Sequence, residues 1–210
     1  KNQWEKAVGR FEKQLQVIKL IFESSTEHKV NFKGEFYQLE EACLQAKSVR
    51  KPHPPVYMAA GAPRTLALCG KYGDGWIPIG YTPELYEEHA KAIKTSMKEN
   101  GRDEKDFQFA VDIDVYFSDD AETAWAKMKN AVKVSLFKPE VLKVHNIKDI
   151  AGFDFKKYFT EYSMSNQEWI VKMREAAQTI PDSVARSSIG MGTPDDIIPV
   201  FERFMKAGVN

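Results

Sequence analysis

The stretch whose residue types most clearly suggest a binding site is residues 56–70, which reads VYMAAGAPRTLALCG. An apolar run stops on small residues, and Pro63 then stands at the start of an amphipathic segment. Small side chains let a ligand approach the backbone, and Gly61 can adopt a positive φ. The free amides of a helix's first turn, the helix dipole and Arg64 can together hold a phosphate. A tight strand-to-helix turn without a ligand is the alternative, and the residue types alone leave both interpretations open.

Other residues give weaker indications of a functional site. Asp112 and Asp114 share one face of an alternating strand, where paired carboxylates act as acid and base, although buried acids paired with Lys or Arg are commoner. Tyr116 at the end of that strand either hydrogen-bonds a substrate or is simply packed. The segments GKYGDG and IGMGTP lack the GxGxxG spacing after a strand and are interpreted as turns and caps. An aromatic series lines a substrate lid or forms a small core of its own: Phe153, Phe155, Tyr158, Phe159, Tyr162 and Trp169.

Several classes of function and site find no support in the composition. Thirty basic residues balance thirty acidic ones without a basic aromatic-rich patch, so a nucleic-acid partner is not expected. The apolar runs are far shorter than the roughly 20 residues of a membrane span, and KNQWEKAVGR lacks a signal-peptide core, so we expect no membrane and a cytoplasmic protein. His28, His53, His89 and His145 show no ligand spacing, so no metal is expected. Cys43 and Cys69 are interpreted as small core residues.

Strand patterns alternate with helix patterns along the chain. Residues 107–117 alternate apolar and polar side chains most clearly, and Phe107 and Phe117 belong to the apolar set. Residues 138–188 show no strand and are predicted to be a helical insertion, with one helix starting at Ser165 and Glu168 in a capping-box relation to it. A final helix begins after Thr193 and stops at Gly208, with Ile197, Ile198, Phe201, Phe204 and Met205 as its buried stripe. The remaining predictions are a helix over 4–23, a hairpin over 30–39, strands at 55–60 and 75–79, and helices over 64–72, 82–100 and 121–137.

This order predicts an α/β fold with parallel strands and right-handed crossovers, either doubly wound or a (β/α) barrel. Only three full core strands are recognisable, whereas a barrel needs eight strands and about 250 residues. We therefore expect a small open sheet or part of a larger barrel. The beginning inside a helix and the end at the entry to a strand, Val209-Asn210, favour part of a barrel, with residues 1–210 as one incomplete domain.

Three segments in register resemble the luciferase-like monooxygenase superfamily: NFKGEFYQL, PPVYMAAGAPRTLALCGKYGDGWIPIG and GTPDDIIPVFERFMKAGVN. The resemblance covers essentially the whole chain. The AAGAP form is similar to the branch that uses the deazaflavin coenzyme F420, which contains methylenetetrahydromethanopterin reductases, secondary-alcohol dehydrogenases and ketoreductases. The resemblance implies a partial (β/α)8 TIM barrel holding strands five to seven, the C-terminal two-thirds of the family's barrel.

The resemblance also implies an activity and a site. The activity is hydride transfer between F420 and a small organic substrate by a cytoplasmic homo-oligomer such as a dimer, with the isolated chain inactive. An FMN-dependent monooxygenase and a non-catalytic binding module are the alternatives. No catalytic residue is named, because the groups that orient the deazaflavin lie mainly on early strands not present here. The implied cofactor contacts are Ala59, Ala60, Gly61, Ala62 and Pro63 with Arg64 and Thr65 at the end of strand five, and Ile79 and Gly80, followed by Tyr81, at the end of strand six.

Overall fold

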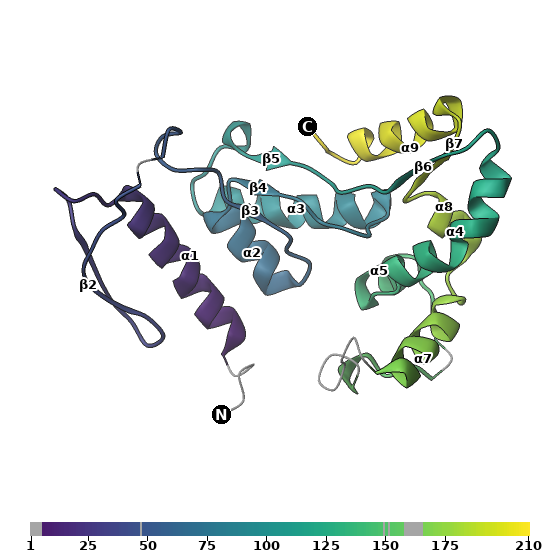
Figure 1. Ribbon diagram of the computed structural model, residues 1–210, viewed down its shortest axis with the longest axis horizontal. Coiled ribbons are helices and arrows are strands. Elements are labelled where there is room, and N and C mark those ends of the chain that lie inside the picture. The colour runs from purple at the N-terminus through teal and green to yellow at the C-terminus, as the bar shows by residue number, and fades with distance from the viewer. Residues whose placement is uncertain (1–5, 47, 149, 151, 158–165) are drawn as a thin grey trace. The chain divides into compact units, whose positions relative to one another are not determined.

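The computed structural model describes residues 6–46, 48–148, 150, 152–157 and 166–210. These residues form two compact units, one made of residues 1–76 with 92–107 and the other of residues 77–91 with 108–210. Helix α3 (Pro83–Glu99) begins in the second unit and ends in the first. Figure 1 gives the element labels used below.

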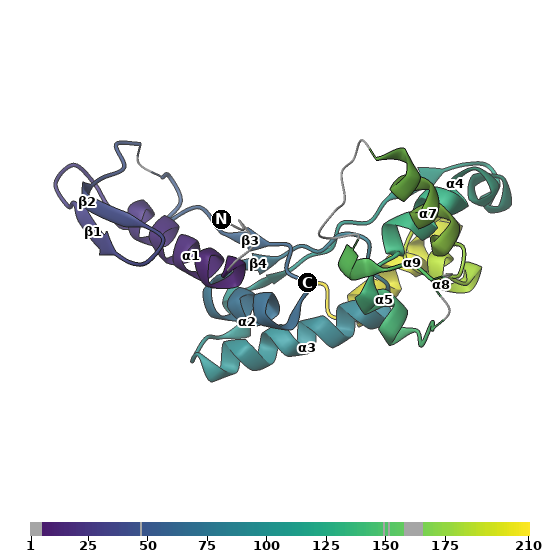
Figure 2. The same ribbon diagram turned by 90° about the horizontal axis from the view of Figure 1, so that it is seen from below.

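The first unit opens with helix α1 (Ala7–Glu23) and a hairpin of β1 (Val30–Lys33) and β2 (Gln38–Ala42). Figures 1 and 2 both show the hairpin beside α1. The antiparallel register pairs Phe32 with Leu39, which confirms the predicted hairpin. Only Leu15 and Val17 of α1 are fully buried, so the predicted apolar face of this helix is half open. Trp4, the first residue of that face in the sequence pattern, lies outside the described residues.

The part of this unit that matters for function is a strand–helix–strand segment. Strand β3 (Tyr57–Met58) leads into α2 (Pro63–Tyr72), which returns to β4 (Gly75–Trp76). The two strands are parallel, with Tyr57 opposite Gly75 and Met58 opposite Trp76. This confirms the parallel pairing expected of a strand–helix–strand unit. The predicted start of the helix at Pro63 is also confirmed.

Helix α3 packs closely against α2. A Cβ added at Gly70 would lie 2.6 Å from the carbonyl oxygen of Ile93, so only glycine permits this approach. The apolar side of α3 is buried as predicted, with Leu85, Ile93 and Met97 at most 1% exposed. A short 3-10 turn (Glu104–Asp106) follows α3.

Residues 107–117 were predicted to be one continuous strand, and this is wrong. The segment forms β5 (Gln108–Phe109) and β6 (Val115–Phe117), and between them Asp112 makes a parallel bridge with Ile79. The amide of Asp112 donates to the carbonyl of Pro78 at 3.0 Å. Residues 77–79 and 112 are therefore parallel neighbours, as expected for the predicted strands at 75–79 and 107–117. Alternation predicted the apolar face but not its burial, because Phe117 is 76% exposed.

A third strand of the second unit lies where turns and caps were predicted. Strand β7 (Gly190–Gly192), within IGMGTP, pairs in parallel with β6. Glycines are poor strand formers, which hid this strand from sequence patterning. Here they are required by close packing, since a Cβ at Gly190 would lie 2.9 Å from the side chain of Ile197.

Helix α9 (Pro194–Lys206) follows β7 and has the predicted cap, because the Thr193 amide and hydroxyl both donate to Asp196. Its predicted buried stripe is only partly correct. Ile197 and Phe204 are buried, whereas Ile198, Phe201 and Met205 are 49%, 39% and 66% exposed. Residues consecutive in a helix face directions that differ by about 100°, so the surface that covers Ile197 leaves Ile198 exposed.

The helical insertion contains α5 (Pro139–Val144), α7 (Gln167–Ala177) and α8 (Asp182–Arg186), and its described residues hold no strand, as predicted. It follows α4 (Ala121–Leu136), which contacts α7 and α8, and Figure 2 shows these three helices grouped together. The predicted start of a helix at Ser165 lies outside the described residues. The N-cap of α7 is Asn166, whose side chain accepts from the Trp169 amide.

Candidate functional site

The carboxyl end of β3 holds seven of the predicted cofactor contacts. Ala60 is buried and its carbonyl accepts a 2.9 Å hydrogen bond from the indole nitrogen of Trp76 on β4. This bond fixes the backbone just before the turn. Ala59, Ala62, Pro63 and Arg64 are exposed, and Gly61 and Thr65 are half-buried, so the turn is open on its outer side.

The start of α2 has no side-chain cap. Its N-cap is Ala62, which has no side-chain acceptor, and Pro63 follows at the first helical position. The Thr65 hydroxyl accepts from the Ala62 amide at 3.2 Å and donates to the Ala62 carbonyl at 2.9 Å. An α-helix leaves its first amides without intrahelical acceptors. An N-cap without an acceptor therefore leaves the amides of the first turn for water or a ligand.

The expectation that Gly61 uses a positive φ is wrong. Gly61 is not among the described glycines with positive φ, which are Gly80, Gly101, Gly152, Gly192 and Gly208. A left-handed backbone therefore gives no reason for glycine at position 61, which leaves its missing side chain as the relevant property. The positive φ of the site residues belongs instead to Gly80, with φ 65°.

A pocket of about 410 Å³ lies beside this turn, wholly within the first unit. Its wall is apolar except for Gln14 and Thr65, which suits an apolar or ring-shaped group better than a phosphate. Neither Arg64 nor Pro63 lines it. The full lining is Phe11, Gln14, Leu15 and Ile18 of α1 with Val56, Tyr57, Met58, Ala59, Ala60 and Thr65.

Sequence reasoning missed the contribution of α1 to this pocket. The stripe of Phe11, Leu15 and Ile18 was interpreted only as a buried helix face. The incomplete burial of that stripe appears only once the partner elements are placed. The helical spacing of these residues was the available signal, but it cannot tell a pocket wall from a core.

The other predicted contacts, Ile79 and Gly80, lie in the second unit, so they are described apart from the β3 turn. Ile79 is 58% exposed. The ammonium of Lys138 donates to the carbonyls of Ile79 and Gly80 at 2.5 and 3.3 Å. Tyr81 follows as a buried residue, and its hydroxyl lies 3.1 Å from Nδ1 of His89. Burial raises the pKa of Tyr81 and lowers the pKa of His89, so both groups are neutral at pH 7.

The structure gives no support to an acid–base pair on strand seven. Asp112 and Asp114 are both exposed, and neither forms an ion pair with a described residue. The expectation that they pair as buried acids with Lys or Arg is therefore wrong as well. Tyr116 is half-buried in β6. Sequence alternation predicted one face for the two aspartates, but the continuous strand on which that prediction rests does not form, and alternation could not give their exposure.

Several further expectations can be compared with the described residues. The described residues include no cluster of His, Cys, Asp and Glu able to hold a metal ion. None of the helices formed by these residues is long and apolar enough to cross a bilayer. Cys69 is fully buried, and desolvation raises its thiol pKa to about 12, which confirms it as a core residue. Cys43 is half-buried.

The aromatic residues of the insertion pack on one another. Phe153 contacts Phe137, Phe155 and Trp169 with ring centroids 5.1, 5.1 and 6.0 Å apart. This arrangement is a small core belonging to the insertion, one of the two interpretations that the sequence left open. Tyr158, Phe159 and Tyr162 lie outside the described residues.

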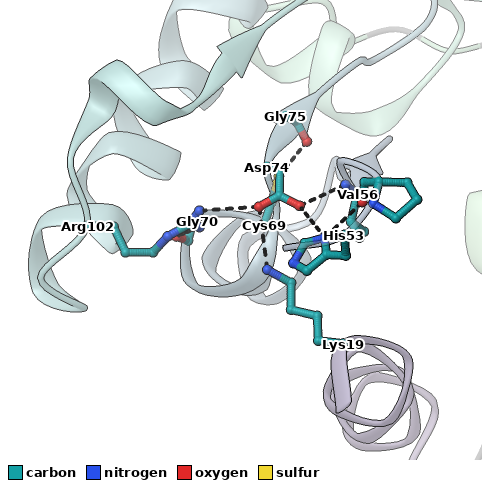
Figure 3. A network of polar contacts seen from close by, with 9 residues as sticks. Lys19, His53, Val56, Cys69, Gly70, Asp74, Gly75 and Arg102 are labelled. Carbon is teal, nitrogen blue, oxygen red and sulfur yellow. Dashed lines mark hydrogen bonds and ion pairs between the residues drawn. The ribbon is translucent and has the colours of Figure 1, made fainter. Parts of the chain in front are cut away.

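At the opposite end of β3 and β4, Asp74 is the centre of a polar network that sequence reasoning did not identify (Figure 3). Its carboxylate accepts from the Val56 amide at 2.8 Å, and the Asp74 amide donates to the Val56 carbonyl at 2.8 Å. This reciprocal pair fixes the register of the two strands at their start. Three basic groups surround the same carboxylate, Lys19 Nζ at 3.5 Å, His53 Nδ1 at 3.7 Å and Arg102 Nη2 at 3.9 Å.

Comparison with known proteins gives a family match over almost the entire chain. The model of the luciferase-like monooxygenase family matches residues 2–210. This confirms the resemblance read from the three sequence segments, and with it a luciferase-like α/β fold of the TIM-barrel type.

Curated relatives and solved structures agree with this match. An F420-dependent glucose-6-phosphate dehydrogenase of Amycolatopsis mediterranei is 28% identical over 100% of this chain and 56% of its own length. A phthiodiolone/phenolphthiodiolone dimycocerosates ketoreductase of Mycobacterium bovis is 25% identical over 93% of this chain and 52% of its own. An F420-dependent secondary alcohol dehydrogenase, solved with an F420–acetone adduct, superposes with a TM-score of 0.69 at 19% identity, over 94% of this chain and 52% of its own. The chain thus spans about half the length of these relatives.

Proposed function

Because this chain belongs to the luciferase-like monooxygenase family, we propose that the protein is an oxidoreductase that transfers a hydride between coenzyme F420 and a small organic substrate. The relatives named as F420-dependent support F420 over FMN. The structural observation that carries the proposal is the open turn between β3 and α2. This uncapped helix start lies at the carboxyl end of β3, where α/β proteins bind cofactors, and it adjoins an apolar pocket lined by residues 56–60, which include β3, and by α1.

The described residues fit parts of such a coenzyme. The first-turn amides of α2 suit its phosphate, and Arg64, exposed beside them, supplies a positive charge. Ala59, Ala60, Gly61 and Ala62 keep bulk away from the backbone. A pocket of about 410 Å³ takes a ring or an apolar chain rather than the whole coenzyme. When bound, F420 supplies the hydride chemistry, and these residues bind and orient it.

The experiment that tests this proposal is a competition between two cofactors. The intact protein is incubated with F420 or with FMN, passed through a desalting column, and its absorption spectrum is recorded. Retention of F420 alone is the expected result. Retention of FMN alone would show an FMN-dependent enzyme of the same family, and retention of neither would favour a non-catalytic binding module.

Retention alone does not show where the coenzyme binds, so a matched pair of variants is included. Gly61→Val places a branched side chain in the turn. Gly9→Val places the same side chain in α1, where an added Cβ would meet no described residue more closely than Phe36 at 3.8 Å. The proposal predicts loss of F420 retention for Gly61→Val and full retention for Gly9→Val.

A further inference from the structure

Helix α5 is bonded at both of its ends to residues 79–82, a segment that lies beyond β4 in the sequence. Lys138, the N-cap of α5, reaches the carbonyls of Ile79 and Gly80. His145, the C-cap of the same helix, has Nε2 2.8 Å from the hydroxyl of Thr82. All of these residues belong to the second unit. We call Lys138, α5 and His145 together the α5 clamp.

The contact of Lys138 is more specific than a surface lysine on a carbonyl. Lys138 is half-buried, and this desolvation lowers its pKa, while the nearby charge of Glu140 raises it. Its ammonium also lies 5.6 Å from the centre of the Tyr81 ring. A partly desolvated ammonium that donates to two carbonyls holds them more firmly than an exposed one does.

Gly80 makes this contact possible. Its φ of 65° is a conformation that other residues rarely adopt. A Cβ at this position would lie 2.6 Å from the Ser135 carbonyl and 2.9 Å from the Lys138 ammonium. Both the backbone conformation and the missing side chain of Gly80 are therefore needed for the end of α4 and Lys138 to approach strand six.

The contact of His145 is supported from the far side. Glu84 lies 3.7 Å from the same His145 nitrogen and accepts a 2.8 Å hydrogen bond from Arg203 of α9. Thr82 is fully buried, and its hydroxyl also lies 3.4 Å from the Leu85 amide at the start of α3. The exposed Ile79 and the half-buried Gly80 thus stand between two fixed points, Lys138 and Thr82.

We propose that Lys138 is a positioning residue that, with the α5 clamp, holds residues 79–82 in the conformation that binds coenzyme or substrate. The proposal rests on the proposed function, because residues 79 and 80 border the cofactor cleft only if the chain binds as its family resemblance implies. It assigns a task to the first part of the insertion, which is to fix a wall of the site.

The test compares Lys138→Met with Lys138→Arg, whose guanidinium can still donate to both carbonyls. Lys133→Met is the matched control, because Lys133 is a buried lysine of α4 whose ammonium pairs with Asp182 of α8 at 2.6 Å. The first measurement needs no cofactor: it is the methyl NMR signal of Ile79 in the intact protein. The second is the dissociation constant for F420.

We expect one sharp Ile79 methyl signal in the wild type, Lys138→Arg and Lys133→Met, and a broadened or split signal in Lys138→Met. Binding of F420 weakens about tenfold in Lys138→Met and less than threefold in the other two variants, as for the loss of a charge-assisted hydrogen bond that preorganises a site. Lys138→Gln, which keeps one donor group, is measured in parallel in case the Met variant does not fold, and we expect the same direction of change.

The two hypotheses fail in different ways. An Ile79 signal unchanged in Lys138→Met and Lys138→Gln overturns the α5 clamp, whatever the protein binds. An altered Ile79 signal with unchanged F420 affinity shows that Lys138 orders the segment without positioning a cofactor site, and overturns the positioning role. A wild type that does not bind F420 overturns the proposed function, while the Ile79 signal still decides whether Lys138 orders residues 79–82.

Discussion

The two ends of the β3–β4 pair are built in opposite ways. At the amino end, Asp74 exchanges hydrogen bonds with Val56 and faces three basic groups from different segments (Figure 3). At the carboxyl end, small exposed residues lead into a helix whose N-cap has no acceptor side chain. The polar groups at the amino end bond to other residues of the chain. At the carboxyl end, the first-turn amides of α2 are left for water or a ligand.

This difference separates stability from binding along a strand pair only two residues long. In (β/α) barrels the amino ends of strands serve stability and the carboxyl ends carry the site. The β3–β4 pair follows that rule with particular side chains. Substitutions at its amino end should therefore change the free energy of unfolding, and those at its carboxyl end should change ligand affinity.

The largest effect is expected from Asp74→Ala. Removing the carboxylate leaves the Val56 amide without its acceptor and three basic groups without their common partner. We expect the free energy of unfolding to fall by about 2 kcal/mol, measured by urea denaturation. Asp74→Asn keeps an acceptor for Val56 and loses only the charge, so it should cost about half as much. Equal stability of wild type and Asp74→Ala would remove the amino-end half of the comparison.

Gly61→Val should produce the second largest effect, and on affinity rather than stability. Because Gly61 does not use a positive φ, valine avoids the strain of a left-handed backbone there, and we expect the variant to unfold at nearly the wild-type temperature. The branched side chain should weaken F420 binding at least tenfold, or about 1.4 kcal/mol, and nearly equally at low and high salt. A normally folded Gly61→Val that binds F420 as tightly as the wild type would mean that the turn binds nothing.

A pH titration extends the comparison to Tyr81 and His89, two buried polar residues of the second unit. Burial lowers the pKa of His89 in the folded state, so between pH 6.5 and that lowered value the unfolded chain binds more protons. Stability should then fall as the pH drops below about 6.5, by up to roughly 1.4 kcal/mol per pH unit within that window. Thermal unfolding from pH 8 to pH 5 should show a shallower loss for His89→Gln, and identical slopes would refute the prediction.

Arg64→Ala should give the smallest effect. An exposed charge beside a bound phosphate contributes about 0.2–1 kcal/mol, which corresponds to a change of about 1.4- to fivefold in the dissociation constant for F420. Unlike the Gly61→Val effect, it should shrink as salt is added. Titration at low and high salt measures both. A loss larger than tenfold that persists at high salt would indicate a direct and buried contact of Arg64.

The sequence was sufficient where a local pattern determines local structure. Pro63 and Thr193 mark helix starts through backbone geometry and capping, and the structure begins α2 and α9 there. Parallel pairing followed from helices between strands, and β3 and β4 confirm it. The three segments in register identified the family, which the match over residues 2–210 confirms.

Exposure and long-range contacts were not available from patterns. Asp112, Asp114 and Phe117 are exposed, and their exposure depends on which distant segments cover residues 107–117. Strand β7 was missed because glycines have low strand propensity, whereas here Gly190 packs against Ile197 and Gly192 against Asp196 and Ala121. Asp74 and Lys138 were missed because their partners lie far from them in the sequence, so no spacing reveals them.

The central claim is that the carboxyl end of the β3–β4 pair binds the coenzyme while the amino end serves stability. Backbone NMR of the intact protein during a titration with F420 tests it most directly. We expect the amide signals of Gly61, Ala62, Arg64 and Thr65 to shift with a common dissociation constant, while those of Val56, Asp74 and Gly75 stay in place. Shifts confined to the amino end, or an unchanged turn under conditions where F420 binds, would contradict it.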